Sequence, residues 1–335
     1  MEKISVIIPC RNEGKYITGC LESIIKNDYA HEDIEIFFVD GSSADNTREI
    51  IEKYAKQFSF IHLLLNKKKT VPYALNMGIE KSSGDYIIRL DAHGEIPSNY
   101  FSKLIKWSKE LNADNIGAGW ITDVKNKNPK TIAIKKVLSN KYGVGNSYFR
   151  TGINEIKEVD TVPFGCFRKD VFQKVGLFDN RLTRNQDIEL NKRIKRKDGK
   201  IYLLPHLFSN YFARETYFDI AKNNFQTGLY NILTVYFTKR FSSLSLRHFI
   251  PLVFILSLVL PLLVMFWIPY SGLISLVIFS LYLIIITVIS VSIKDRTTTI
   301  RHILLAFMTL HFSYGFGSLI GIFKINALFQ KSEND

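Results

Sequence analysis

The chain has 335 residues, 47% of them hydrophobic, and a formal net charge of +13. Its length allows one domain of ordinary core size plus a further segment, and its charge favours an anionic partner such as nucleic acid, a lipid surface or a small anionic substrate. The apolar run in MEKISVIIP is too short for a signal peptide, so none is expected. The cysteines lack metal-site spacing, and we expect free thiols in a cytosolic domain at Cys10, Cys20 and Cys166.

Strands and helices alternate through the first 92 residues. Short β-branched runs predict buried strands at 4–10, 34–47 (where the strand runs into a Gly-Ser turn), 60–66 and 85–92. Apolar residues at helical spacing predict helices between them, at 12–27, 47–58 and 71–82. This alternation predicts an α/β fold, with a mostly parallel sheet and helices on both of its faces.

Polar residues follow three of these strands, at Pro9–Glu13, Asp40–Ser43 and Asp91–His93. Parallel sheets bind ligands at the carboxyl ends of their strands, so we expect these three segments to converge on one site. A single aspartate in a sequence such as DGSS is often only a turn former, and the three segments together are the stronger signal.

Beyond residue 97 the pattern is less regular. Residues 99–112 are predicted to form a helix, and the polar residues 122–158 to form loops or a mobile flap. Residues 159–179 carry strand, turn and helix signals, and 185–199 form a predicted helix that starts with acidic and ends with basic residues. Its basic end has no interleaved aromatic residues and no nucleic-acid fold signature, so we expect no nucleic-acid partner.

From residue 249 the sequence is mostly apolar. Three runs, 249–270, 272–293 and 302–323, each have about the 20 residues that a helix needs to cross a hydrocarbon core. The third run contains histidines and glycines, and re-entry into the membrane is its alternative. Basic residues beside the runs favour the cytoplasmic side for the N-terminal part.

These features predict a multi-pass protein of the cell membrane, in contact with membrane lipids. We expect a cytosolic domain at 1–215, interfacial amphipathic helices at 216–248 and a membrane domain at 249–325. Gly317 and Gly321 have the spacing of a close helix contact, and we interpret them as packing residues.

Five motifs follow one another along the chain: SVIIPCRNE, FVDGSSADNT, ALNMGIEKSSGDYIIRLDAH, VPFGCFRKDVFQKVGLFD and NQDIELNKRI. In this order they resemble the family 2 inverting glycosyltransferases of GT-A fold, over about residues 3–210. RLDAHGEIP and HFSYGFGSLIG are similar to the membrane-attached branch typified by succinoglycan-type exopolysaccharide enzymes. The resemblance implies a nucleotide-diphosphate sugar donor (with UDP expected), a divalent metal, Mn²⁺ or Mg²⁺, and a polyprenyl-diphosphate-linked saccharide acceptor.

The resemblance also implies roles for the strand-end residues on the donor side. Asp40 would accept a hydrogen bond from the base, while Pro9, Arg11 and Glu13 would line the base and ribose. Asp91 stands where the family has the first acid of Asp-x-Asp, which holds the cation against the diphosphate.

His93 takes the place of the second acid of Asp-x-Asp, and two interpretations stay open. As a ligand beside Asp91 it would suit Mn²⁺, which accepts imidazole, better than Mg²⁺. Otherwise Asp91 alone leads the coordination and His93 contacts phosphate or acceptor.

On the acceptor side, Asp187 matches the aspartate of the family's Glu-Asp pair and is the predicted general base, with Gln186 replacing the glutamate. Glu189, two positions later, is the second choice and is grouped with the acceptor-binding residues. In PFGCF, Phe164 would give the sugar a flat face and Gly165 would allow close approach of the backbone.

The predicted function is single-sugar transfer by an inverting glycosyltransferase in exopolysaccharide, capsule or other cell-surface glycan synthesis. A processive synthase subunit is the nearest alternative, but no Trp follows a Gln-x-x-Arg pattern. A non-catalytic nucleotide-sugar-binding membrane protein is another. A sugar nucleotidyltransferase is disfavoured because PCRNEGKY contains a single glycine where that class has a Gly-rich phosphate loop.

Overall fold

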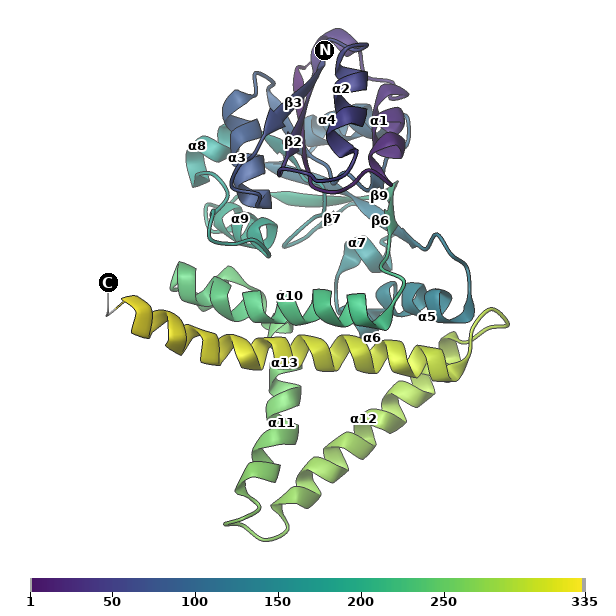
Figure 1. Cartoon of the computed structure of the whole chain (residues 1–335), viewed down its shortest axis with the longest axis vertical. Helices are drawn as coiled ribbons and strands as arrows, with labels where there is room; N and C mark the ends of the chain where they lie inside the picture. Colours follow the sequence, from purple (N-terminus) through teal and green to yellow (C-terminus); the bar gives the residue numbers. More distant parts are fainter. Residues whose placement is uncertain (1, 333–335) are drawn as a thin grey trace. The chain divides into compact units, whose positions relative to one another are not determined.

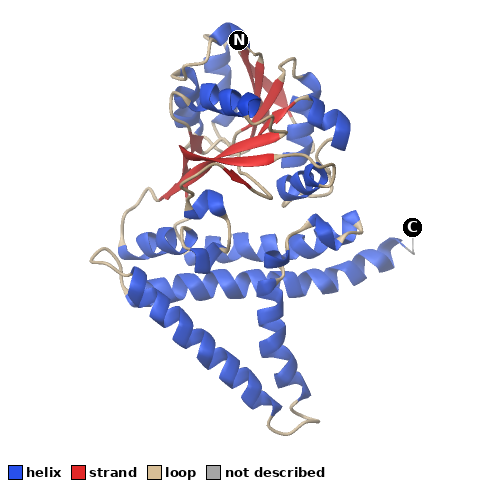
Figure 2. Ribbon diagram, turned by 180° about the vertical axis from the view of Figure 1, so that it is seen from behind, coloured by secondary structure: helices blue, strands red, loops and turns tan. Residues whose placement is uncertain are grey.

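The computed structural model describes residues 2–332, with the backbone alone for 326–332. The chain divides into two compact units, one formed by residues 1–121 and 148–212 and the other by 122–147 and 213–335. Figure 1 labels the elements along the chain, and Figure 2 shows the strands in red and the helices in blue.

The first half of the sheet is parallel, as the alternation of elements predicts. Its strands lie in the order β3-β2-β1-β4, and all three pairings between them are parallel. These elements are β1 (Ile4–Cys10), α1 (Ile17–Ile25), β2 (Ile34–Asp40), α2 (Thr47–Ala55), β3 (Ile61–Leu65), α3 (Val71–Lys81) and β4 (Tyr86–Arg89), with a short 3-10 turn, η1, at His31–Asp33.

The second half of the sheet is antiparallel. It continues in the order β8-β6-β9-β5 from β4, and β7 pairs with β9. Its elements are β5 (Gly94–Glu95), α4 (Tyr100–Glu110), β6 (Asn115–Asp123), β7 (Lys157–Glu158), β8 (Cys166–Arg168), α8 (Asp170–Val175), α9 (Gln186–Lys195) and β9 (Ile201–Phe212).

Helices cover both faces of the sheet, because alternate residues of its strands are buried on opposite sides. One core cluster joins Val6 and Ile8 of β1 to α1, α2 and α4. The other joins Ile7, on the opposite face of β1, to α3, α8 and α9. The predicted α/β architecture is thus confirmed in its layers.

The loops predicted at 122–158 are contradicted by the structure, while the mobility of this segment stays a prediction. The segment contains α5 (Pro129–Leu138), α6 (Lys141–Val144) and α7 (Tyr148–Thr151). α5 begins with a capping box, in which the Asn128 side chain accepts from the backbone of Thr131 and the Thr131 hydroxyl accepts from Asn128. Its apolar residues Ala133, Ile134 and Val137 are buried, so the helix is stabilised despite its lysines.

The C-terminal unit contains α10 (Tyr217–Thr238), α11 (Ile250–Val264), α12 (Ser271–Ile293) and α13 (Ile300–Ser332), with 3-10 turns η2 (Phe241–Ser243) and η3 (Leu246–His248). In the part of the chain that the structure describes, α12 and residues Ile300–Ile325 of α13 are long and apolar enough to cross a membrane. α11 has only 15 residues and ends at Val264, so it is shorter than the run to 270 that the sequence predicts.

α10 and α13 pack against each other through glycines, as the spacing of Gly317 and Gly321 predicts. A Cβ on Gly317 would lie 2.0 Å from the carbonyl oxygen of Phe225, and one on Gly228 would lie 2.0 Å from that of Tyr314. The two backbones are therefore in direct contact, and only glycine fits at these positions.

Candidate active site

Two loops are joined at the carboxyl ends of β1 and β2. Asn12, in the left-handed region with φ 59°, donates its backbone N–H to Ser43 Oγ at 2.9 Å, and its side-chain oxygen accepts from the backbone of Ala44 at 2.8 Å. The backbone N–H of Glu13 donates to Thr47 Oγ1 at 2.8 Å. The segments Pro9–Glu13 and Asp40–Ser43 are therefore brought together, as predicted from their positions after strands.

Asp40 is closed to solvent in this arrangement. Its carboxylate accepts the backbone N–H of Ser43 at 3.1 Å and the Ser43 hydroxyl, and it lies 3.8 Å from Arg48 Nε. These contacts are those of an aspartate that fixes a turn. Its contact with a nucleotide base stays a prediction.

Arg89 joins the two acids that the sequence assigns to different roles. It is the last residue of β4, with a side chain only 14% exposed. Its Nη2 donates to Asp91 Oδ1 at 3.0 Å, and its Nη1 lies 3.6 Å from Asp187 Oδ2 in the first turn of α9. The strand end at Asp91 and the helix start at Asp187 therefore form one charged cluster.

Electrostatics in this cluster favour the ionised form of Asp91. Burial would raise the pKa of its carboxyl, but the charge and hydrogen bond of Arg89 hold that pKa below its usual range. Burial likewise opposes the charge on Arg89, while the two carboxylates keep its pKa above the ordinary value. A guanidinium and two carboxylates are thus held together at the end of β4.

His93 faces Glu13 from the turn after Asp91. Its Nδ1 lies 3.4 Å from Glu13 Oε1, and its ring packs edge-on against Tyr16 and Tyr211. Burial would lower the pKa of His93, but the hydrogen bond to Glu13 and the charge of Asp91 raise it to about 9.

Asp91 is the carboxylate best suited to a metal ion. Among the described residues, no group of three or more His, Cys, Asp and Glu side chains could hold one. Metal-binding imidazole must be neutral, whereas His93 is turned to a carboxylate. Asp91 uses Oδ1 for Arg89, while no side-chain contact occupies its Oδ2 within the described part of the chain. These contacts fit a divalent cation for which Asp91 would be the protein ligand.

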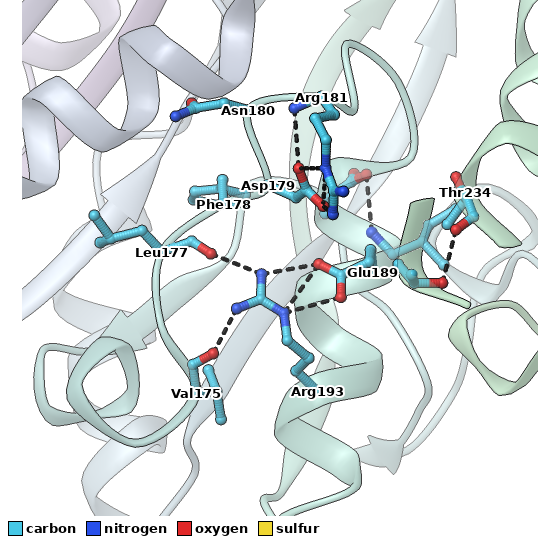
Figure 3. A network of polar contacts seen from close by, with 12 residues as sticks. Val175, Leu177, Phe178, Asp179, Asn180, Arg181, Glu189, Arg193 and Thr234 are labelled. Carbon is cyan, nitrogen blue, oxygen red and sulfur yellow. Dashed lines mark hydrogen bonds and ion pairs between the residues drawn. The ribbon is translucent and has the colours of Figure 1, made fainter. Parts of the chain in front are cut away.

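Glu189 has a structural position that departs from its predicted place at the acceptor. Its side chain is 4% exposed, and Arg193 Nε and Nη2 donate to its two oxygens at 2.9 and 2.8 Å. Arg193 also donates to the carbonyl oxygens of Val175 and Leu177 (Figure 3). The pair fastens α9 to the end of α8 and the residues that follow it, and Asp187 is the acid of α9 that faces Arg89.

Phe164 is also placed differently from its prediction. It is 2% exposed, so it cannot give a sugar a flat face in this arrangement. Its neighbour Gly165 approaches closely to the interior: its carbonyl accepts the Arg89 backbone N–H at 3.0 Å, and a Cβ would lie 2.5 Å from Asn115 Oδ1. PFGCF therefore supports the end of β4.

A pair of half-buried aromatic rings beside Phe164 was missed by the sequence reasoning. The rings of Trp120 and Tyr211 stack with centroids 4.4 Å apart and an interplanar angle of 2°. The guanidinium of Arg150 lies 4.6 Å from the Trp120 ring centroid and 5.0 Å from that of Tyr211. The pairing of β6 with β9 could have revealed the stack, but neither strand carries a clear local signal.

The family model for glycosyl transferase family 2 matches residues 5–176. The chain belongs to this family. The matched range contains Asp40, Arg89 and Asp91 and ends ten residues before α9 begins at Gln186. The predicted family is thereby confirmed.

Two named relatives extend the match. The dolichyl N-acetyl-alpha-D-glucosaminyl phosphate 3-beta-D-2,3-diacetamido-2,3-dideoxy-beta-D-glucuronosyltransferase of Methanococcus voltae is 30% identical over 234 residues, which are 68% of this chain and 72% of that protein. Succinoglycan biosynthesis protein ExoA of Rhizobium meliloti (strain 1021) is 27% identical over 212 residues, which are 62% of this chain and 63% of that protein. The first name is that of a glycosyltransferase and the second that of a polysaccharide biosynthesis protein.

Solved structures of similar fold identify the fold of this chain. A mannosyltransferase from Pyrobaculum calidifontis, in complex with GDP-Man and Mn²⁺, is similar with a TM-score of 0.60 and 13% identity, over 95% of this chain and 87% of that one. At this identity the likeness shows the fold alone. This family 2 glycosyltransferase therefore has the GT-A fold that the resemblance of its motifs implies.

Proposed function

We propose that this glycosyltransferase transfers one sugar, with inversion, from a nucleotide-diphosphate sugar to a lipid-linked saccharide. A UDP-sugar is the expected donor and a polyprenyl-diphosphate-linked saccharide the expected acceptor, at the cytoplasmic face of a membrane. The cluster of Asp91, Arg89 and Asp187 carries the proposal, because it joins an acid suited to the donor side with an acid suited to the acceptor side. The names of the two relatives support a lipid-linked or polysaccharide product.

Asp187 is the general base in this proposal. Its side chain is 35% exposed, so an acceptor hydroxyl can reach it from solvent. Its Oδ1 accepts the backbone N–H of Ile188 at 3.0 Å, which orients the carboxylate. Asp187 takes the hydroxyl proton while the oxygen forms a bond to the anomeric carbon. The bond from that carbon to the diphosphate breaks, and its electron pair leaves with the nucleotide, so the configuration inverts.

Asp91 would hold the divalent cation, Mn²⁺ or Mg²⁺. When bound, the cation offsets negative charge on the departing diphosphate. Arg89 keeps Asp91 ionised and oriented, and His93 is paired with Glu13. We therefore favour a phosphate or acceptor contact for His93, with Asp91 alone as the protein ligand.

The remaining contacts follow from the loops and the aromatic stack. Pro9, Arg11 and Glu13 would line the base and ribose, since the loop that contains them is fixed to the loop after β2. Trp120 and Tyr211 offer stacked rings where the sequence suggests Phe164. We propose this stack, with Arg150, as the flat surface for the acceptor sugar.

Membrane attachment is proposed from the C-terminal unit. Its α12 has 23 residues and no charge, and only 17% of the residues in its most apolar stretch are buried. Exposed apolar helices of this length are covered by lipid in membrane proteins. This attachment would place the enzyme beside a lipid-linked acceptor.

The test is transfer by purified full chain, followed as release of nucleoside diphosphate from a panel of UDP-, GDP- and TDP-sugars, with and without Mn²⁺. With the active donor, Asp187→Asn should lower turnover by about 10²–10⁴-fold while donor binding is retained. Asp170→Asn is the matched control, because that exposed acid pairs with Lys174 on α8, outside the Arg89 cluster. Undiminished transfer by Asp187→Asn would remove Asp187 as the base.

A further inference from the structure

The helices of the C-terminal unit differ in what covers them. α11 and α12 form a hairpin without charged residues between Phe249 and Ile293. The tip of the hairpin is the most exposed part, with Phe266 84%, Trp267 80% and Tyr270 82% exposed. The legs contact each other near the tip, where Ser271 Oγ donates to the carbonyl of Pro261 at 2.8 Å and Ser275 Oγ to that of Leu258 at 2.7 Å.

α13, by contrast, is bound to polar partners along its length. Thr298, just before it, donates to the carbonyl of Pro129 on α5 at 2.6 Å. His311 Nε2 lies 2.9 Å from the carbonyl oxygen of Tyr142 on α6, and Ser318 Oγ donates to the carbonyl of Gly228 on α10 at 3.1 Å. From 298 to 318 the chain rises by about 30 Å, the thickness of a hydrocarbon core.

α10 and α13 lie side by side and run in the same direction, as Figures 1 and 2 show. Tyr217 Oη is 3.1 Å from His302 Nδ1 at one end of the pair, and Phe225 contacts Gly317 further along. The exposed charged residues Asp219 and Lys222 lie between these two levels. If residues 302–323 crossed the core, both charges would enter it, and charged side chains are strongly disfavoured there.

The start of α11 also argues against a membrane-spanning α13. A Cβ on Gly315 would lie 2.4 Å from the carbonyl oxygen of Pro251, so the first turn of α11 crosses α13 near the middle of its apolar run. Figure 1 shows α11 running away from α13 at this point rather than beside it. If α13 crossed the membrane, Arg247 and His248, which precede α11, would lie near the centre of the bilayer. The two helices therefore cannot both be spans.

We propose that the α11–α12 hairpin inserts into a lipid bilayer from one face, while the α10–α13 pair lies along that face at the level of the headgroups. α13 is then an interfacial helix, although its composition would allow a span. α11 is about 22 Å long, shorter than the hydrocarbon core of about 30 Å, so the tip remains within the bilayer.

Charge supports a lipid bilayer as the occupant of this surface. The residues that flank the hairpin include six cations, Lys239, Arg240, Arg247, Lys294, Arg296 and Arg301. Asp295 is the one acid of residues 239–301, and Lys136 Nζ donates to it at 2.8 Å. Cations on both sides of an apolar hairpin suit anionic headgroups.

The inference depends on the membrane attachment proposed above and is tested separately from it. The full chain is produced with a single new cysteine at Arg296→Cys or Lys324→Cys, two exposed positions on either side of the apolar run of α13. The unsubstituted chain is the control, because Cys10, Cys20 and Cys166 are buried. Sealed vesicles of one orientation are treated with a membrane-impermeant maleimide before and after they are opened.

We expect both cysteines to be labelled from the same face, with equal protection in sealed vesicles. Labelling of the two from opposite faces would establish a spanning α13 and overturn the inference. A cysteine that stays unlabelled in opened vesicles until detergent dissolves the bilayer would also overturn it, because that position would lie inside the hydrocarbon. If the chain washes off the vesicles in alkaline carbonate, the proposed attachment itself fails, whatever the labelling.

A second measurement places the tip. Phospholipids with a quencher deep in the acyl chain should reduce the tryptophan fluorescence of the reconstituted chain, and Trp267→Phe should abolish most of that reduction. Quenching equal to that of the Trp267→Phe variant would show that the tip is outside the hydrocarbon. Contact of the tip with a second copy of the chain would give that outcome and would contradict insertion.

Discussion

Replacing Arg89 by methionine tests the charged cluster directly. The Arg89 side chain is 14% exposed and that of Asp91, 3.0 Å away, is 23% exposed. Removing one partner of a buried ion pair costs about 3–5 kcal/mol, because the other charge is left uncompensated. Asp91 keeps some contact with solvent, so we expect the free energy of unfolding to fall by about 3 kcal/mol. Asp187 is 35% exposed and 3.6 Å from Arg89, so losing this contact should add little to the fall in the free energy of unfolding.

The pH dependence of this loss has a defined sign. Burial raises the pKa of Asp91, but Arg89 lowers it further, so it lies below the usual range in the native protein. Stabilisation from a lowered carboxyl pKa is present above the unfolded-state pKa and is lost as the pH falls through the folded-state value. In Arg89→Met only the charge of His93 still opposes burial, and the pKa of Asp91 rises. The loss of stability should therefore be smaller at about pH 5 than at about pH 8.

The measurement is urea unfolding of the full chain in detergent, followed by tryptophan fluorescence. A Trp267→Phe background leaves Trp107 and Trp120, both in the first unit, as reporters of that unit. Lys109→Met is the control, since its solvent-exposed pair with Glu2 should contribute little to stability. Adding Asp91→Asn to Arg89→Met should recover about 1–2 kcal/mol. Equal losses in Arg89→Met and Lys109→Met, or no recovery, would refute the ion-pair reasoning.

Three further predictions follow from the same contacts. Burial raises the pKa of the thiols at Cys10, Cys20 and Cys166, so a disulfide reagent should modify none of them in the native protein and all three in urea. Glu189→Gln should lower the free energy of unfolding by about 2 kcal/mol, since Arg193 keeps its two backbone carbonyls; unchanged urea midpoints would show that the pair is unimportant. His93→Asp would bring a second carboxylate to Glu13, and we expect it to abolish transfer, whereas His93→Asn should retain more. Full transfer by His93→Asp with a shift from Mn²⁺ to Mg²⁺ would instead establish His93 as a ligand.

The first half of the fold is predictable because its signals are local. The strands at 4–10 and 34–40 are β-branched or aromatic runs that end at turn residues, and the intervening helices have apolar residues at helical spacing. The helices in the segment 122–158 are hard to predict because its many lysines and asparagines favour a loop. The opposing signal is only a short helix cap at Asn128, Pro129 and Thr131. Composition is a poor guide where a helix buries only one narrow stripe.

The candidate site was predictable by residue type but not by partnership. Asp91 and Asp187 are predicted from motifs. Arg89, which connects them, has no predicted role, and almost a hundred residues of sequence separate it from Asp187. The stack of Trp120 on Tyr211 depends on β6 lying beside β9 in the sheet, and no local sequence pattern predicts that neighbourhood. Contacts of this kind are set by the tertiary fold, so they cannot be predicted from neighbouring residues in the sequence.

The motif PFGCF shows how such a contact can change the meaning of a motif. Phe164 has φ 47°, a conformation that costs a non-glycine residue about 1–2 kcal/mol and persists only where packing enforces it. Here Trp120 packs on the Phe164 ring with centroids 5.3 Å apart, and the turn holds the Gly165 carbonyl 3.0 Å from the Arg89 backbone N–H. A side chain at Gly165 would meet Asn115 and the Phe167 ring and separate β8 from its neighbours. Because β8 lies beside β4, that separation would move Arg89 and both acids, so the motif acts through the position of Arg89 rather than by touching a sugar.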